Sequence, residues 1–298
     1  MTSHLSVRTR SVYDVGIQRY YQFCQAARLD PLCATPVQIV NFLGSLYEES
    51  ISLSTAKVYL AAVNNLFVEC GLDSPTASTA VTNAVKGYSR LNPKQPDRRL
   101  PVTYEIMRHI RMNIPTTSGN VHDQRVHWCA FTFAFFGFLR VSEVAAPSSC
   151  GAVPLRGIDV ELGRDTVTLS IRRSKTDQTG EGQAVVLHAS KRSVCPVAAC
   201  SALQDSLRAL GFWSRNDSFF TMKDGSVLTV SRFRESFKIA LAGVAERHRF
   251  GTHSFRIGAA TEAAMAGTHP DDIKLAGRWK SGAYQGYIRR PNVSGLRL

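Results

Sequence analysis

The chain has 298 residues, 44% hydrophobic and 20% charged, a composition that excludes a disordered or collagen-like protein and suits two globular domains. Its formal net charge of +13 indicates a polyanionic partner, of which duplex DNA is the commonest. No stretch of 18 apolar residues and no apolar signal-peptide core occurs, so we expect neither a membrane span nor secretion.

The basic surplus is uneven along the chain. Residues 1–100 hold 10 of the 36 Lys and Arg residues and 7 of the 23 Asp and Glu residues, which leaves +10 of the net charge after residue 100. The C-terminal part is therefore expected to dominate contacts with phosphates. The seven cysteines are scattered, as is typical of reduced thiols in an intracellular protein. Cys195 and Cys200 lack a second pair at ligand spacing, so we expect no zinc site.

Residues 1–90 are predicted to form an all-helical domain, because apolar residues recur at helical spacing between short turns. The predicted helices lie at about residues 12–24, from Pro36 onward, after Ser54 as far as Gly71, and at about 76–90. For the second helix, Thr35 and Gln38 form a capping box and Pro36 takes the first helical position.

Residues 91–102 are predicted to be an extended basic linker. The segment contains three prolines and few apolar residues, which disfavours regular structure. At ~3.1 Å per residue it spans roughly 30 Å, enough to pass alongside a duplex. Its cations Lys94, Arg98 and Arg99 would then contact phosphates.

Residues 103–298 are predicted to form a larger domain that is mostly α with a small β-ribbon. Two strands, at about 164–173 and 183–187, flank a polar loop at 174–182. The predicted helices lie at about 103–113, 122–137, 196–210, 230–246, 253–266, 271–277 and 281–288.

Arg140 follows a very apolar helix and precedes a new one. An arginine at such a place must be paired or must bind an anion, because a bare buried charge is costly. Glu143 lies three residues further on and could steady it through a carboxylate pair. The alternative is an Arg–Glu pair with a purely structural role.

A second segment, THSFRIGAA, places His253 and Arg256 in the first turn of a predicted helix with Thr252 as its N-cap. Two basic side chains near the free N–H groups of a helix terminus favour a phosphate or another anion. Taken alone, the segment is equally compatible with a structural histidine.

A third segment, GRWKSGAYQGYIR, holds Trp279, Tyr284 and Tyr287 among basic residues. Taken alone, it is compatible with an aromatic cluster on a basic surface helix.

The ordered set Arg…Lys on a ribbon…His-x-x-Arg…Trp…Tyr resembles the catalytic signature of the tyrosine recombinase (phage integrase) family. The GRWKSGAYQGYIR stretch is similar to Cre-like members and to the recombinases of DIRS and Crypton mobile elements. The resemblance implies an all-helical core-binding domain and an α+β catalytic domain that close as a C-shaped clamp around DNA. It also implies an intracellular enzyme on DNA, in the nucleus of a eukaryote or the cytoplasm and nucleoid of a prokaryote.

The resemblance also implies a role for each motif residue. Arg140 and Arg256 would hold the nonbridging oxygens of the scissile phosphate, and Tyr287 would attack it to give a 3′-phosphotyrosyl link. The supporting residues would be His253 as proton acceptor or phosphate ligand, Lys175 as the acid for the leaving 5′-oxygen, Trp279 as a hydrogen-bond donor, and Glu143 as the residue that orients Arg140. No metal and no other cofactor are implied, because the phosphotyrosine conserves the energy of the broken bond.

Two of these assignments have competitors in the sequence. Tyr284 competes with Tyr287 for the nucleophile, and the Ile-Arg pair after Tyr287 favours the latter. Lys175 lies toward the tip of the predicted ribbon, whereas Lys191 and Lys223 are the other candidates for the acid.

The expected partners are double-stranded DNA with a specific recombination site and further copies of the chain, as a dimer or tetramer on DNA. The expected activity is integration or excision of a mobile element. A type IB topoisomerase or resolvase, and a domesticated DNA-binding protein that no longer cuts, are the alternatives. The candidate DNA contacts are Arg8, Arg10, Lys57, Lys86, Arg90, Lys94, Arg98, Arg99, Arg278 and Lys280.

Overall fold

The computed structural model describes residues 5, 7–93, 97–148, 153–172, 182–190 and 192–289, without the side chains of residues 7 and 8. The chain divides into two compact units, Met1–Asp97 and Arg98–Leu298. The division falls inside the segment predicted to be a linker. Among the described residues, no helix is both long and apolar enough to cross a membrane.

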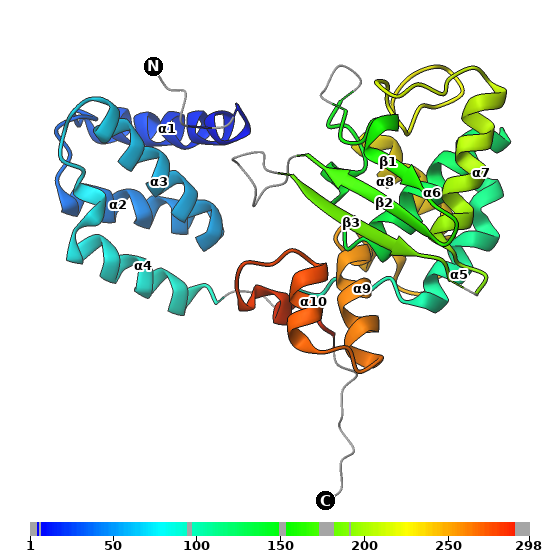
Figure 1. Ribbon diagram of the computed structural model, residues 1–298. Coiled ribbons are helices and arrows are strands. Elements are labelled where there is room, and N and C mark those ends of the chain that lie inside the picture. The colour runs from blue at the N-terminus through cyan, green and yellow to red at the C-terminus, as the bar shows by residue number, and fades with distance from the viewer. Residues whose placement is uncertain are drawn as a thin grey trace, which may run out of the picture. The chain divides into compact units, whose positions relative to one another are not determined.

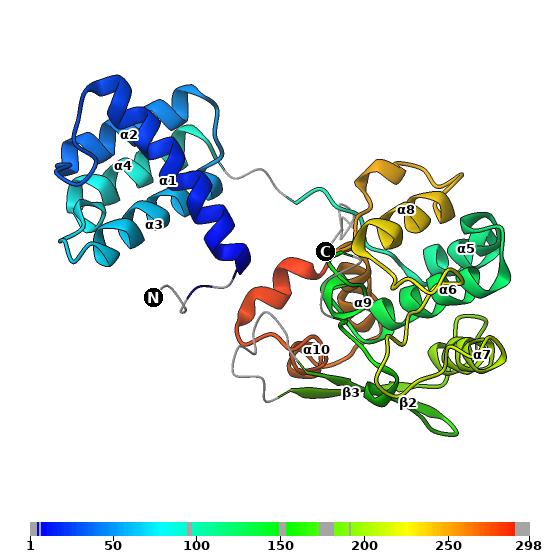
Figure 2. The same ribbon diagram turned by 90° about the horizontal axis from the view of Figure 1, so that it is seen from above.

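The first unit is a helical bundle in which α1 and α3 lie side by side (Figure 1, Figure 2). Gly16 permits this close approach, because a Cβ there would lie 2.9 Å from the Tyr59 ring. The capping box predicted at Thr35 and Gln38 is present, whereas the third helix is capped by Ser52 and begins before Ser54. The elements are α1 (Val7–Ala27), α2 (Pro36–Glu48), α3 (Leu53–Glu69), the 3-10 helix η1 (Pro75–Ala77) and α4 (Thr79–Leu91).

The second unit is built around one buried helix, α6. Ten of its 16 residues are buried, as expected of a helix that is apolar on all sides. Its Phe131 packs against Phe233, Phe237 and Phe255, which joins α6 to α8 and α9. The helices are α5 (Tyr104–Asn113), α6 (Val121–Phe136), α7 (Pro196–Ala209), α8 (Val230–Ala240), α9 (Ser254–Met265) and α10 (Pro270–Ala276), with the short 3-10 helices η2 (Ile114–Thr117), η3 (Val141–Glu143), η4 (Gly157–Asp159), η5 (Arg247–Arg249) and η6 (Gly282–Tyr287).

A three-stranded antiparallel sheet packs against α7 (Figure 1). Its strands are β1 (Val160–Leu162), β2 (Thr166–Ile171) and β3 (Gln183–His188), in the order β1-β2-β3. The fold class predicted from the sequence, mostly α with a small β-ribbon, is confirmed. The sequence pattern missed β1, because a three-residue strand is too short to show alternation, and β2 begins only after the turn from Gly163 to Thr166.

Two helices differ from their prediction: one ends earlier and the other is a 3-10 helix. The helix expected at 230–246 stops at Ala240, because Gly243 and Glu246 both take the left-handed conformation. The segment expected as a helix at 281–288 is the single 3-10 helix η6. A 3-10 helix eclipses side chains three residues apart, which here places Tyr284 and Tyr287 on the same side.

Helix α9 is anchored to the start of the second unit. The Val102 N–H donates to the Ser254 carbonyl at 2.9 Å, and the Leu100 N–H donates to the Arg249 carbonyl at 3.1 Å. A Cβ at Gly258 would lie 1.8 Å from the Val102 carbonyl oxygen, so only glycine allows this contact. These contacts fix the N-terminal end of α9, which carries His253 and Arg256.

Candidate functional site

Two helices end at the site, and both end in the same way. At the end of α6, Phe138 adopts a left-handed conformation (φ 51°), and Leu139 N–H donates back to the Ala134 carbonyl. At the end of α10, Arg278 does the same (φ 55°), and Trp279 N–H donates back to the Lys274 carbonyl. Both ends are Schellman motifs whose left-handed position holds a residue other than glycine. Such a residue costs about 1–2 kcal/mol in backbone strain.

The carbonyl groups at these two helix ends face arginine side chains. The carbonyl of Gly137 accepts from Arg278 Nη1 at 3.1 Å, and that of Phe138 accepts from Arg256 Nη1 at 2.5 Å. The carbonyl of Gly277 accepts from Arg256 Nη2. The C-terminal end of a helix carries partial negative charge, so both ends stabilise the guanidinium groups that they contact.

The pair predicted between Arg140 and Glu143 is present. Arg140 Nη1 donates to Glu143 Oε1 at 3.0 Å, and the backbone N–H of Arg140 donates to Glu143 Oε2 at 2.9 Å. The Glu143 side chain is 2% exposed and that of Arg140 is 17% exposed. Arg140 therefore reaches the surface while its carboxylate partner stays buried.

Arg278 is buried, contrary to the expectation that it contacts DNA at the surface. Its side chain is 4% exposed, and Nη2 pairs with Glu143 Oε2 at 2.6 Å. The left-handed turn at residue 278 directs the side chain inward, toward the end of α6, instead of into solvent. A basic residue between a glycine and a tryptophan gives no sequence signal for such a turn.

Arg256 is the most deeply buried charge of the site, with a relative exposure of 1%. Its guanidinium carbon lies 4.1 Å from the centre of the Trp279 ring and 5.7 Å from that of Tyr287, and Nε has no hydrogen-bond partner among the described residues. Burial, and then repulsion by the other two arginines, lowers the pKa of Arg256 to about 10. The side chain therefore stays charged at neutral pH, with N–H donors to spare.

Aromatic side chains lie over the guanidinium of Arg256 and against one another. The Trp279 ring lies 5.1 Å from Tyr287, 6.3 Å from Tyr284 and 6.1 Å from Phe138, measured between ring centres. Gly277 makes the arrangement possible, because a Cβ there would lie 1.6 Å from an atom of the Trp279 ring. The Gly-Arg-Trp triplet thus turns Arg278 inward and folds Trp279 back over Arg256.

His253 lies beside Tyr287, with ring centres 6.5 Å apart. The N-cap of α9 is His253 itself, so the prediction of Thr252 as N-cap is wrong. The reason is a tight turn before the helix, in which Ser254 N–H donates to the Gly251 carbonyl and Gly251 N–H donates to the Ser254 hydroxyl. Tyr287 contacts both His253 and Arg256, whereas the ring contact found for Tyr284 is with Trp279.

The charges of the arginine cluster, defined as Arg140, Arg256, Arg278 and Glu143, sum to +2. Two of the guanidinium groups pair with the carboxylate, and Arg256 interacts electrostatically with the other three charges. A dianionic group is the chemical complement of such a site. The cluster can therefore neutralise the charge that develops on a phosphate during displacement.

Of the candidates for the acid that protonates the leaving oxygen, Lys223 lies too far from Arg140. Its backbone N–H donates to Asp123 in the first turn of α6, whereas Arg140 follows the other end of that helix. With ~1.5 Å of rise per residue, the two ends lie about 20 Å apart, beyond the reach of a lysine. Lys175 and Lys191 lie outside the described residues; in the sequence, Lys175 falls between β2 and β3.

Most of the candidate DNA contacts in the described part of the chain lie on the surface. The exposed ones are Arg10, Lys57, Lys86, Arg90, Arg98, Arg99 and Lys280. Lys94 lies outside the described residues, as does the side chain of Arg8. Arg98 and Arg99 line a hollow of about 890 Å³ together with His248 and Arg249, two further basic residues that no sequence motif marks.

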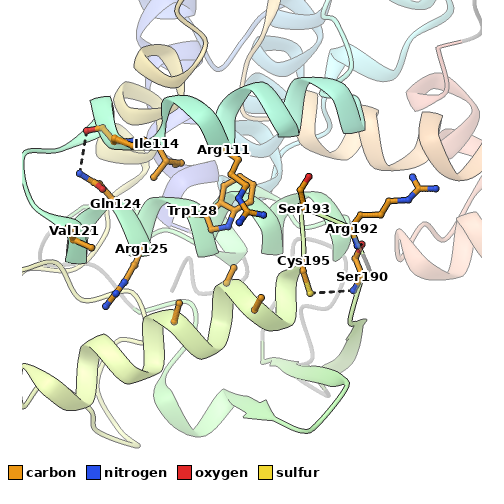
Figure 3. Close-up of a pocket in the computed structure, with 14 residues that line it drawn as sticks. Arg111, Ile114, Val121, Gln124, Arg125, Trp128, Ser190, Arg192, Ser193 and Cys195 are labelled. Carbon is orange, nitrogen blue, oxygen red and sulfur yellow. Dashed lines mark hydrogen bonds between the residues drawn. The ribbon is translucent and has the colours of Figure 1, made fainter.

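A separate groove of about 740 Å³ lies between α5, α6 and α7 (Figure 3). Arg111, Arg125 and Trp128 line it, and Arg192, at its rim, stacks on the ring of Tyr104. None of the residues of the arginine cluster lines this groove.

Neither a protein-family model nor a curated protein sequence matches the chain. Solved structures match it at low identity. XerH site-specific recombinase bound to difH substrate is 16% identical (TM-score 0.65), over 95% of this chain and 76% of that one. A lambda integrase dimer bound to a COC′ core site is 15% identical (TM-score 0.63), over 100% of this chain and 94% of that one. The Tn1549 transposon integrase with transposon right end DNA is 13% identical (TM-score 0.63), over 97% of this chain and 91% of that one. The chain has the tyrosine recombinase fold.

The packing at Gly277 leads to a testable expectation. Gly277→Ala should force the Trp279 ring off Arg256, destabilising the second unit by about 1–3 kcal/mol through overpacking. Acrylamide quenching of tryptophan fluorescence should rise, and the rise should vanish in a Trp279→Phe background. Gly286→Ala is the matched control, since a Cβ there meets nothing within 4 Å. Unchanged quenching in Gly277→Ala would contradict the described packing.

Proposed function

We propose that this chain is a site-specific recombinase of a mobile element that cleaves and rejoins DNA through a 3′-phosphotyrosyl intermediate. The main support is convergence. Residues predicted from separate sequence motifs contact one another in a chain that has the tyrosine recombinase fold. Arg140 pairs with Glu143, and the Tyr287 ring lies near Arg256, Trp279 and His253.

In the proposed reaction, the Tyr287 hydroxyl attacks the scissile phosphorus and its proton passes to His253. A Tyr–O–P bond forms while the bond from phosphorus to the 5′-oxygen breaks, and Lys175 protonates the leaving oxygen. The pentavalent transition state carries two negative charges, which the net charge of +2 on the arginine cluster balances. Rejoining reverses each step, so no external source of energy is needed.

Access to Arg256 is linked to the nucleophile. The Tyr287 ring and, more closely, the Trp279 ring lie over the guanidinium of Arg256, a residue that is 1% exposed. Arg140, with 17% of its side chain exposed, meets an incoming phosphate first. When the Tyr287 ring turns toward the phosphorus it uncovers part of Arg256, whose Nε has no partner in the described part of the chain. Attack and the second guanidinium contact therefore occur together.

The exposed cations supply affinity for the DNA backbone. Arg10, Lys57, Lys86 and Arg90 belong to the helical unit, and Arg98, Arg99 and Lys280 to the second unit. We propose that the two units, which the basic segment at residues 91–102 joins in the sequence, close as a clamp around the duplex. The solved structures of XerH, lambda integrase and the Tn1549 integrase are complexes with DNA, and the lambda integrase complex is a dimer. We propose the same partners for this chain: a specific duplex site and a second copy.

The proposed chemistry predicts which tyrosine becomes linked to DNA. On a nicked suicide duplex in EDTA, the wild type and Tyr284→Phe should form a covalent protein–DNA complex, whereas Tyr287→Phe should form none. Loss with Tyr284→Phe alone would move the nucleophile to residue 284. If the wild type bound the duplex yet never became attached, the chain would be a DNA-binding protein that does not cleave. A wild type that relaxed supercoiled DNA without paired sites would be a topoisomerase.

The role of Lys175 predicts a rescue. Lys175→Ala should slow cleavage of ordinary DNA by about 10²–10⁴-fold, the usual contribution of a general acid. A substrate with sulfur in place of the bridging 5′-oxygen has a leaving group that needs no proton, so the variant should then cleave at nearly the wild-type rate. Lys223→Ala, at the far end of α6, is the control and should match the wild type on both substrates. A Lys175→Ala defect of equal size on both would exclude Lys175 as the acid.

A further inference from the structure

We propose that Arg278 is a positioning residue for the phosphate site: by neutralising Glu143, it leaves the charge of Arg140 available to the phosphate. The proposal rests on the proposed function and extends it to a residue outside the signature set. It replaces the expectation from the sequence that Arg278 contacts DNA at the surface.

Glu143 is shared between two guanidinium groups. Its Oε1 accepts from Arg140 Nη1 at 3.0 Å, and its Oε2 accepts from Arg278 Nη2 at 2.6 Å. The Oε2 atom also accepts from the backbone N–H of Arg140 at 2.9 Å. The shorter contact, and the more deeply buried one, is with Arg278, whose side chain is 4% exposed against 17% for Arg140. A pair in a drier environment interacts more strongly.

The charge balance explains why the third arginine matters. With Arg140 and Glu143 alone, the two charges cancel, and Arg256 would be the single net charge facing a phosphate. Arg278 raises the net charge of the arginine cluster from +1 to +2. Because the transition state gains a second negative charge, this increment stabilises the transition state more than the bound substrate.

The backbone around Arg278 is shaped for this contact. The residue takes a left-handed conformation at the end of α10, which non-glycine residues rarely adopt. That conformation allows the planar guanidinium to bridge two acceptors, Glu143 and the Gly137 carbonyl at the end of α6. A lysine ammonium could supply the charge without the same two-sided fit. Arg278 thus joins the turn that carries Trp279 to the turn that carries Arg140.

A purely structural ion pair makes a different prediction, which a double variant can test. Arg278→Met lowers the net charge of the cluster to +1 and should slow covalent complex formation by about 10²-fold. Adding Glu143→Gln restores the charge to +2 and should recover at least about tenfold of that loss. If Arg278 served only to hold the fold together, removing its partner as well would restore the free energy of unfolding but not the cleavage rate measured on the folded protein.

The experiment measures single-turnover cleavage of the nicked duplex and, separately, binding of inorganic vanadate by calorimetry at fixed ionic strength. The rates and affinities should rank wild type, then Arg278→Met with Glu143→Gln, then Arg278→Met alone. Lys274→Met removes one charge from the same helix end and should stay within about twofold of the wild type in both assays. A folded double variant no faster and no tighter-binding than Arg278→Met would overturn the proposal.

Two further comparisons keep the test decisive. If Arg278→Met does not fold, the cleavage rate of the double variant is compared with that of Glu143→Gln alone. Both variants retain a net cluster charge of at least +2, so their rates should be similar. A double variant more than about tenfold slower than Glu143→Gln would contradict charge compensation. Vanadate binding separates this proposal from the proposed function. If the vanadate affinities follow the expected order but the protein never becomes attached to DNA, the role of Arg278 stands and the proposed recombinase function is wrong.

Discussion

The site depends on one buried carboxylate, Glu143, which two guanidinium groups share. A buried charge of either sign is costly unless it is paired and hydrogen-bonded, and here each charge supplies the pairing for another. Removing the carboxylate would leave three arginines repelling one another near the ends of two helices. Removing either paired arginine would leave Glu143 with a single guanidinium partner. The arrangement therefore holds Arg140 at the surface and Arg256 in the interior with a fixed net charge.

The two helix ends provide the frame for these charges. Helices α6 and α10 end in the same left-handed turn, and their last carbonyl groups are the acceptors that the buried arginines need. Helix α9 supplies Arg256 from a third direction and is held against Val102 by Gly258. Helix α6 and the consecutive helices α9 and α10, more than 100 residues further along the chain, thus meet at one charge cluster. In the proposed function, this rigidity preorganises the phosphate site before DNA binds.

The residues of the candidate site carry a clearer sequence signal than the elements around them. The set of Arg140, Glu143, His253, Arg256, Trp279 and Tyr287 could be found because their order and spacing form a signature. The capping box at Thr35 could be found because its signal is local. Short turns determine three features that were not predicted: the strand β1, the early end of α8 and the N-cap of α9. The burial of Arg278 depends on an unusual backbone conformation and a partner 135 residues away, which no local pattern contains.

The most direct test of the account is whether the arginine cluster acts on the charge of the scissile phosphate. A methylphosphonate at the cleavage site replaces a nonbridging oxygen with a methyl group and so removes one negative charge. Arg140→Ala should slow covalent complex formation on the natural phosphodiester by about 10²–10³-fold. On the methylphosphonate, the same variant should come within about tenfold of the wild type. An equal loss on both substrates would show that Arg140 does not neutralise the phosphate, and the central claim would fail.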